Sequence, residues 1–334
     1  MSSDWVCQKP CPYSQKMETR ALGKSDLKVS TVCFGAWPIG GGMGNVDPKQ
    51  AADTIHAAVD AGITFIDTAE GYQTSESVLG QALKGRRDSV ILASKLSGPD
   101  HSEKHIREAI ENSLSALNIE YIDLYQLHTP QPKWPIKNTM EILMDLKKQG
   151  KIRHIGLSNF TSDQTQEAME FGPIISSQPR YNLLFRQENP TLTFCKENQI
   201  GVIPHSVLAK GLLGGSYKPG HTFPKDDERR LFNFFQGELF QTIYEVTQQL
   251  EEWAKSHGRD LIQLAIAWAL ANSAVTSAIV GMKSVVQVQN VAQASTWKLT
   301  STDLSEVEAV IGNLQPEWIK DQTQEDLPYR FGSY

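Results

Sequence analysis

The chain has 334 residues, of which 40% are hydrophobic and 21% charged, and its net charge is -6 at pH 7. This length can supply one large core, and α/β barrels commonly use about 250 residues as a single unit. Because the chain is acidic and no run of Lys or Arg exceeds two residues, we do not expect it to bind a nucleic-acid backbone.

Neither the N-terminus nor the cysteines indicate secretion. Residues 1–16 are polar and lack the apolar core of a signal peptide, and no stretch approaches the roughly 18 apolar residues of a membrane span. A lone CxxxC spacing without a second pair is not a zinc signature. We therefore expect a cytoplasmic protein with reduced thiols, no metal and no membrane partner. The four cysteines are Cys7, Cys11, Cys33 and Cys195.

The first predicted element is a β-hairpin over residues 19–30, with a turn at Gly23. Strands and helices then alternate. We expect strands at 29–34, 64–67, 90–95, 122–128, 152–157, 174–178, 200–204 and 278–281. We expect helices at 51–59, 76–83, 106–117, 139–146, 192–197, 239–255, 261–270 and 285–294, and one that follows Thr161.

Helix boundaries are marked by residues that favour them. Asp47 before Pro48 is a typical N-cap. Capping boxes are predicted for the pairs Thr161 and Gln164, Asp260 and Gln263, and Ser284 and Gln287. A long polar loop covers about residues 214–236.

Alternating strands and helices predict a parallel sheet, and strands that are continuous apolar runs are buried on both faces. Eight such strands favour a (β/α)8 TIM barrel with an N-terminal β-hairpin and a long loop after strand 7. The alternative is an open doubly wound sheet. Its GxGxxG fingerprint is absent, because the glycines at 40–44 lie in a loop ahead of Asp47.

The residues at the carboxyl ends of the predicted strands are mostly polar. In a barrel these ends meet at one mouth, where active sites of this fold lie. Taken singly, each has an ordinary structural explanation, such as a turn former, a helix cap or a surface lysine. The residues are Trp37, Asp67, Lys95, His128, Ser158, Asn159, Gln178, His205 and Gly281.

The chemistry of three of these side chains, together with Tyr72 five residues after Asp67, suggests proton transfer. A lysine cation beside a phenol stabilises the phenolate, so Lys95 is expected to lower the pKa of Tyr72. Asp67 would keep Lys95 charged and oriented. Tyr72 could then protonate a developing alkoxide while His128, as a neutral donor, polarises the carbonyl.

A second group suits a nicotinamide and its phosphates. Ser158, Asn159 and Gln178 offer groups for a carboxamide. Lys283 and Ser284 open the last barrel helix, where N–H groups and the helix dipole favour an anion such as a 2'-phosphate.

The chain resembles the aldo-keto reductases over nearly all of residues 17–314, and most closely the bacterial and plant branches. The motifs are the hairpin at 20–23, Phe65-Ile66-Asp67-Thr68-Ala69 with Tyr72, Ser94-Lys95, Leu127-His128, Gly156-Leu157-Ser158-Asn159-Phe160, Tyr181 to Arg186, Leu208-Ala209-Lys210-Gly211-Leu212-Leu213, and Ile279-Val280-Gly281 with Gln287.

The resemblance implies that Asp67, Tyr72, Lys95 and His128 form the catalytic tetrad, and that NADPH binds across the mouth without a Rossmann motif. The expected cofactor contacts are Ala36, Trp37, Asp67, Ser158, Asn159, Gln178, His205, Ser206, Val207, Leu208, Lys210, Gly281, Lys283, Ser284, Gln287 and Asn290.

The chain departs from the family pattern where many members place a stacking Tyr or Trp. His205 stands there and Val207 replaces a proline, and a histidine that titrates near neutral pH would make cofactor affinity depend on pH. Ser216 replaces a lysine, for which Arg229 or Arg230 could substitute. The asparagine of the final helix has moved to Asn290, which leaves Val291 in its place.

The resemblance implies an NADPH-dependent reductase of small aldehydes or ketones, with methylglyoxal or a semialdehyde as expected substrates. The alternative is a cofactor-binding regulatory subunit of the same fold, and metal-assisted hydrolysis lacks ligands. Residues 1–16 are expected to be an extension and 17–314 the barrel. The aromatic tail 315–334 could cover the barrel mouth or pack on the side of the barrel, and we expect packing. The sequence predicts no oligomeric state.

Overall fold

The computed structural model describes residues 17–44, 46–186, 189–225 and 227–312. At its centre is an eight-stranded sheet in the order β10-β3-β4-β5-β6-β7-β8-β9, in which all neighbours are parallel. The strands are β3 (Val32–Gly35), β4 (Phe65–Asp67), β5 (Ile91–Leu96), β6 (Ile122–Leu127), β7 (Ile152–Ser158), β8 (Ile174–Gln178), β9 (Gly201–Val202) and β10 (Ala278–Gly281).

The two ends of this strand order meet. The Thr276 N–H donates to the Val202 carbonyl at 2.7 Å, and the Ile279 N–H donates to the Pro204 carbonyl at 3.0 Å. The sheet therefore closes on itself, which confirms the predicted barrel.

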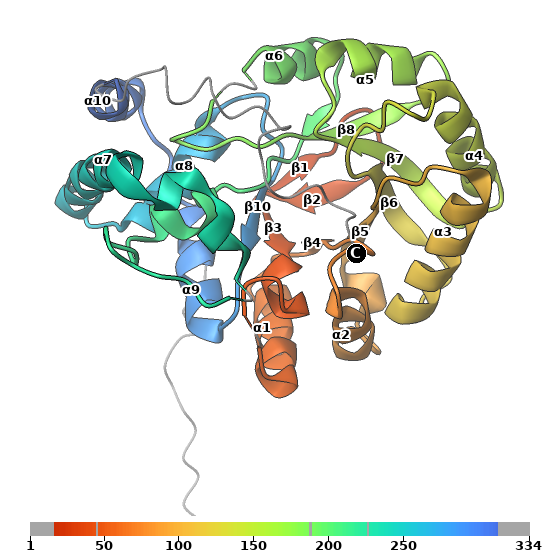
Figure 1. Cartoon of the computed structure of the whole chain (residues 1–334), viewed down its shortest axis with the longest axis horizontal. Coiled ribbons are helices and arrows are strands. Elements are labelled where there is room, and N and C mark those ends of the chain that lie inside the picture. The colour runs from red at the N-terminus through yellow and green to blue at the C-terminus, as the bar shows by residue number, and fades with distance from the viewer. Residues whose placement is uncertain (1–16, 45, 187–188, 226, 313–334) are drawn as a thin grey trace, which may run out of the picture.

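Helices surround the strands, with α1 to α6 in an arc and α7 to α10 grouped on the remaining side (Figure 1). Their bounds are α1 (Pro48–Asp60), α2 (Ser75–Ala82), α3 (Glu103–Leu117), α4 (Ile136–Lys148), α5 (Ser162–Met169), α6 (Asn189–Glu197), α7 (Gly237–Ser256), α8 (Leu261–Ala271), α9 (Val285–Ala294) and α10 (Ser301–Ile311). Short 3-10 helices are η1 (Trp37–Gly40), η2 (Arg87–Ser89), η3 (Ala209–Gly214), η4 (Glu228–Leu231) and η5 (Asn233–Phe235).

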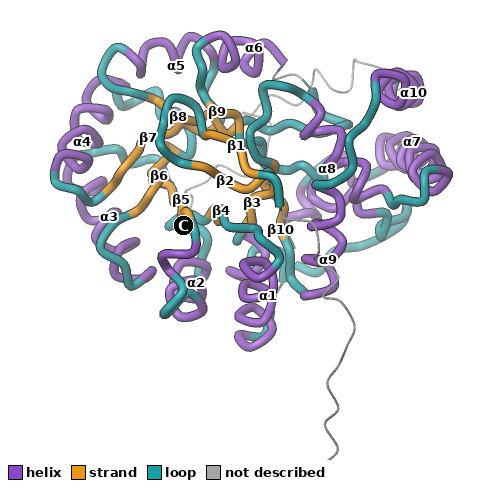
Figure 2. The backbone as a smooth tube through the Cα atoms, turned by 180° about the vertical axis from the view of Figure 1, so that it is seen from behind, coloured by secondary structure: helices purple, strands orange, loops and turns teal. Residues whose placement is uncertain are grey.

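The predicted N-terminal hairpin is present as β1 (Thr19–Ala21) and β2 (Lys28–Ser30), and it lies across one end of the barrel (Figure 2). Its apolar side chains, including Leu22 and Val29, pack with Phe65 and other inward residues of the strands. The turn requires Gly23, because φ is +56° there and a Cβ would come within 2.3 Å of the Ile175 carbonyl oxygen. The hairpin thus fills the amino-terminal end of the barrel and leaves the other end open.

The period-two alternation of a strand explains why polar groups gather at that open end. In β4, Phe65 packs inside the barrel, and Asp67 follows two residues later on the same face. In β5 the inward-facing residues are Ala93 and, two residues later, Lys95. In these two strands the inward-facing row therefore begins with an apolar residue and ends with a charged one at the mouth.

Two predicted helix and strand boundaries need correction. The predicted strand at 29–34 is two strands that break at Thr31. Ser30 is the last residue of β2, where it pairs with Thr19, and its hydroxyl accepts the N–H groups of Thr64 and Phe65. Ser284 caps α9, but the Gln287 side chain accepts from Lys283 and not from Ser284, so only half of the predicted box forms.

The capping boxes at Thr161 and Asp260 are confirmed. Helix α10 was not predicted, although Thr300 and Asp303 form a capping box at its start.

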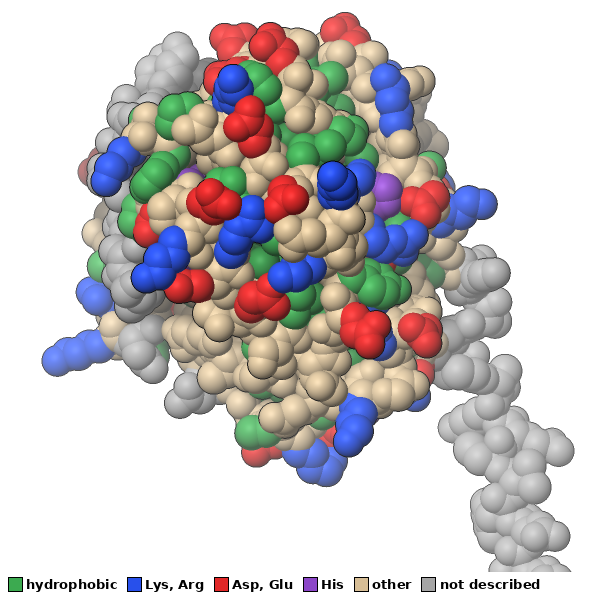
Figure 3. Space-filling view, turned by 90° about the vertical axis from the view of Figure 1, so that its right-hand side faces the viewer, with side chains coloured by type: hydrophobic (Ala, Val, Ile, Leu, Met, Phe, Trp, Pro, Cys, Tyr) green, Lys and Arg blue, Asp and Glu red, His purple; other side chains and the backbone are tan. Residues whose placement is uncertain are grey.

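Within the described ranges no helix is long and apolar enough to cross a bilayer. On the face in Figure 3, acidic and basic side chains are interspersed. The predicted extension 1–16 and tail 315–334 lie outside the described residues.

Candidate active site

A pocket of about 410 Å³ opens at the carboxyl ends of the barrel strands. Most of the residues predicted to contact substrate or cofactor line it, namely Trp37, Asp67, Tyr72, His128, Asn159, Gln178, His205, Ser206, Val207, Leu208, Lys210, Gly281, Lys283 and Gln287. Ala36, Ser158, Ser284 and Asn290 are not among the lining residues. Asn290 instead donates to Asp260 at 2.6 Å. Lys95 does not line the pocket either, but it contacts Asp67 and Tyr72, which do.

Lys95 is the centre of the predicted tetrad. Its side chain is fully buried, and Nζ donates to Asp67 Oδ2 at 2.5 Å, to the Thr68 carbonyl at 2.9 Å and to the Tyr72 hydroxyl at 3.2 Å. A buried ammonium needs this number of acceptors, because an unpaired charge in the interior is strongly destabilising. The geometry links Asp67, Lys95 and Tyr72 in one chain of hydrogen bonds.

Asp67 is held from its other side by two amides. Gln126 and Gln178 donate to Oδ1 at 3.0 and 2.9 Å, and Gln178 also donates to Gln126 Oε1. Gln178 was predicted from the sequence, and Gln126 was not. A signal was present, since Gln126 lies on the same face of the predicted strand as Leu124 and His128.

Tyr72 is buried and its ring packs edge-on against Trp37, with ring centroids 4.8 Å apart. Burial raises the pKa of the Tyr72 phenol well above its usual range, and the carboxylates of Asp67 and Glu228 raise it further. The prediction that Lys95 lowers the pKa of Tyr72 is therefore wrong. The physical reason is that Asp67 offsets the lysine charge while burial disfavours the phenolate. Tyr72 consequently keeps its proton at neutral pH.

His128 lies beside Tyr72, with ring centroids 5.6 Å apart. Its Nδ1 is 2.8 Å from the hydroxyl of Ser97, a residue that the sequence analysis did not single out. Burial lowers the pKa of His128 well below its usual value, and the charge of Lys95 lowers it further. The imidazole is therefore neutral, as a hydrogen-bond donor to a carbonyl must be.

Asn159 and His205 are joined across the pocket. Asn159 Nδ2 donates to the His128 carbonyl and to Ser158 Oγ, so its Oδ1 is the atom that faces His205 Nε2 at 2.9 Å. Since Oδ1 only accepts, Nε2 of His205 carries the proton, and Nδ1 accepts from Ser206 Oγ at 2.9 Å. Asn159 and Ser206 have φ values of 61° and 56°, and non-glycine residues in this region often mark functional sites.

The expectation that His205 titrates near neutral pH is wrong. Burial lowers the pKa of His205 well below its usual value, and the charges of Lys210, Arg180 and Lys95 lower it further. We therefore expect His205 to be neutral from about pH 6.5 upward, its ordinary titration range.

We predict that, if NADPH binds here as the sequence suggests, its affinity is nearly independent of pH in the neutral range, because His205 stays neutral there. The dissociation constant measured by fluorescence titration should differ by less than about twofold between pH 6.5 and pH 8, above the second phosphate pKa near 6. A His205→Tyr variant should show the same ratio between its dissociation constants at the two pH values. If only the wild type loses affinity as pH rises, a charged His205 contacts the cofactor and this assignment fails.

The loop after β9 reaches across the pocket. Glu228 is buried, and its Oε1 accepts from Lys210 Nζ at 2.6 Å and from Trp37 Nε1 at 3.3 Å. The chain enters this loop through Ala209 and Lys210, both with positive φ. Glu228 was not predicted from the sequence, because nothing in a polar loop indicates which carboxylate folds back to the barrel.

Two cations lie at the end of the pocket nearest α9. Lys283 and Arg229 both line it. Burial lowers the pKa of Lys283, and the nearby charge of Arg229 lowers it further. Asp227 pairs with Arg229 at 2.5 Å. Of the two arginines suggested as a replacement for the missing lysine at Ser216, Arg229 lines the pocket, whereas Arg230 donates to the Lys225 carbonyl.

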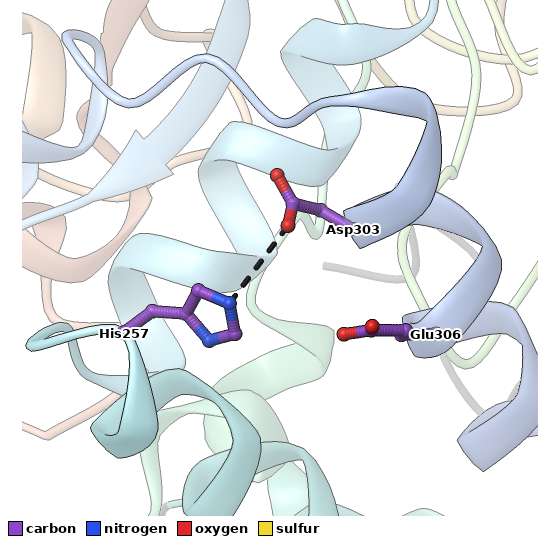
Figure 4. A group of neighbouring side chains, drawn as sticks. All are labelled: His257, Asp303 and Glu306. Carbon is purple, nitrogen blue, oxygen red and sulfur yellow. Dashed lines mark ion pairs between the residues drawn. The ribbon is translucent and has the colours of Figure 1, made fainter.

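One group of His, Asp and Glu residues in the described part of the chain is spaced as metal ligands could be: His257, Asp303 and Glu306 (Figure 4). His257 and Glu306 are exposed, and none of the three lines the pocket. Glu306 accepts from the Trp253 indole, and Asp303 caps α10. The group connects α7 with α10 and has no part in the site.

The chain is similar in sequence and fold to known proteins. A model of the aldo/keto reductase family matches residues 31–311. The chain is 35% identical to aldo-keto reductase YhdN of Bacillus subtilis, over 93% of this chain and all of that one. It is 32% identical to the NADH-specific methylglyoxal reductase of Escherichia coli, over 86% and 96%. The glycerol dehydrogenase AKR11B4 of Gluconobacter oxydans superposes with a TM-score of 0.81 at 32% identity, over 89% and 96%.

Proposed function

The chain belongs to the aldo/keto reductase family of oxidoreductases, and we propose that it reduces small aldehydes and ketones with NADPH, with Tyr72 as the general acid. The observation that carries this proposal is the fully buried ammonium of Lys95, which donates at once to Asp67 and to the Tyr72 hydroxyl. A phenol with a cation at its oxygen is suited to give up a proton to a stronger base and to be stabilised as the phenolate afterwards.

The donors around the pocket fit a nicotinamide dinucleotide phosphate. Asn159 and Gln178 line the end beside the tetrad, where their side-chain amide oxygens can accept from the N–H groups of a carboxamide. Lys283 and Arg229 line the far end and supply cations for a phosphate. When bound, the reduced nicotinamide supplies the hydride.

The chain's own residues supply the proton and the orientation. A substrate carbonyl oxygen placed between the Tyr72 hydroxyl and the His128 imidazole would accept a hydrogen bond from each. As the carbonyl carbon becomes tetrahedral and negative charge develops on the oxygen, Tyr72 transfers its proton there. Lys95 then stabilises the phenolate, and Asp67 keeps the Lys95 ammonium oriented toward the Tyr72 oxygen.

Small carbonyl compounds are the substrates that we propose. Trp37 packs on Tyr72, and Glu228 bridges Trp37 and Lys210, so bulky groups are restricted beside the acid. Methylglyoxal, the substrate in the printed name of the Escherichia coli relative, and semialdehydes are the first compounds to assay.

The direct test is a panel of aldehydes and ketones with NADPH or NADH, followed by loss of near-ultraviolet absorbance. Turnover of at least one small carbonyl supports the proposal. The alternative is a regulatory subunit that binds the cofactor without turning it over. Tight NADPH binding without reduction of any compound in the panel would favour that alternative and contradict ours.

A second prediction concerns the choice of cofactor. Lys283→Met should weaken NADPH binding about tenfold, because a charge-assisted contact to a phosphate is lost, and should change NADH binding by less than about twofold. Lys24→Met, which removes an exposed lysine from the hairpin at the other end of the barrel, is the matched control. If Lys283→Met weakens both cofactors equally, Lys283 does not read the 2'-phosphate.

A further inference from the structure

A hydroxyl at the end of β5 contacts the catalytic histidine candidate. Ser97 directly follows β5, and His128 directly follows the neighbouring strand β6, where the His128 N–H donates to the Leu96 carbonyl at 3.1 Å. This pairing places Ser97 Oγ 2.8 Å from His128 Nδ1. Both side chains are buried, with 6% and 2% of each residue exposed.

The hydrogen bonds around Ser97 determine the direction of this contact. The Gly71 N–H points at Ser97 Oγ from 3.4 Å, and an N–H can only donate. Among the described residues, His128 Nδ1 is the one acceptor in reach of the Ser97 hydroxyl hydrogen. Because buried hydroxyl groups are satisfied where an acceptor is available, Ser97 donates and Nδ1 accepts.

The backbone of Ser97 is fixed independently of its hydroxyl. Its N–H donates to Glu70 Oε1 at 2.5 Å, and Glu70 belongs to the same turn as Tyr72. Burial raises the pKa of Glu70 to about 7, but either protonation state retains an oxygen that accepts this N–H. Ser97 is thus attached to the turn that carries the proposed acid and to the histidine beside it.

We propose that Ser97 is a positioning residue that holds His128 as the tautomer with its proton on Nε2, the form that can donate to a substrate carbonyl. A neutral imidazole has one N–H, so an Nδ1 that accepts from Ser97 leaves the proton on Nε2. With the proton on Nδ1 instead, Nε2 would present a lone pair to the carbonyl oxygen and repel it. The tautomer of His128 is inferred from the hydrogen bonds alone, and only its expected effect on catalysis rests on the proposed reductase function.

The test combines a spectroscopic and a kinetic measurement on Ser97→Ala. Two-bond ¹H–¹⁵N spectra of protein labelled in histidine report the tautomer of each ring directly, and His128→Gln identifies the His128 signals. The wild type should show the Nε2–H pattern, and Ser97→Ala should show a mixture of tautomers. Its kcat should fall about tenfold, while KM and the NADPH dissociation constant change by less than about twofold.

Ser277→Ala is the matched control, because Ser277 is a buried serine whose hydroxyl has no partner within the described residues. It should leave the His128 spectrum and kcat unchanged. An Nδ1–H pattern in the wild type, or an unchanged Nε2–H pattern in Ser97→Ala, would overturn the inference even if the protein is a reductase. Absence of any carbonyl reduction in the wild type would contradict the proposed function, and the spectra would still decide the role of Ser97.

Discussion

Tyr72→Phe should lower kcat for carbonyl reduction by about a thousandfold, within the range of 10² to 10⁴ typical of a lost general acid. The phenylalanine ring keeps the packing against Trp37 but has no proton to give to the developing alkoxide. The NADPH dissociation constant should change by less than about twofold. Steady-state kinetics with the best substrate of the panel and a fluorescence titration measure the two quantities.

Tyr125→Phe is the control for this variant. Tyr125 is also fully buried, and its hydroxyl has no hydrogen-bond partner among the residues that the structure describes. Removing that hydroxyl should leave turnover unchanged and cost little stability. If Tyr72→Phe also retains full turnover, another group supplies the proton and the assignment is wrong.

Lys95→Met should both inactivate and destabilise the protein. The substitution leaves the Asp67 carboxylate buried with amide donors from Gln126 and Gln178 but without its cation. Breaking a buried ion pair in this way costs about 3 to 5 kcal/mol of the free energy of unfolding. Urea unfolding followed by circular dichroism, together with kcat, measures the effect.

The double variant Lys95→Met with Asp67→Asn separates stability from catalysis. It removes both charges, so most of the lost stability should return, whereas activity should not. Recovery of activity together with stability would mean that Lys95 acts only through folding. Failure of Asp67→Asn to restore stability would mean that the two side chains do not depend on each other.

The barrel could be predicted because its signals are local. Apolar strands, helix caps such as Thr161 and Asp260, and the turn at Gly23 each act within a few residues. The tetrad could be predicted as a group for a related reason. Strand alternation and the shared mouth of a barrel bring Asp67 and Lys95 together without knowledge of any loop.

What could not be predicted depends on contacts between distant parts of the chain. Glu228 reaches Trp37 and Lys210 only because the loop after β9 folds over the pocket. The pKa of Tyr72 depends on burial and on two carboxylates, so considering the charge of Lys95 alone predicts a pKa shift in the wrong direction. Ser97 follows Lys95 by two residues, yet its relevance appears only when β6 places His128 beside it.

The measurement that most directly tests the central claim is transfer of deuterium from NADPH labelled at nicotinamide C4. The protein is incubated with the labelled cofactor and a small aldehyde, and the alcohol is analysed by mass spectrometry. If the tetrad reduces carbonyls as proposed, the wild type forms alcohol that carries deuterium on the former carbonyl carbon, and Tyr72→Phe forms almost none. Oxidation of NADPH without labelled alcohol, or equal labelling by both proteins, would contradict the proposed reaction.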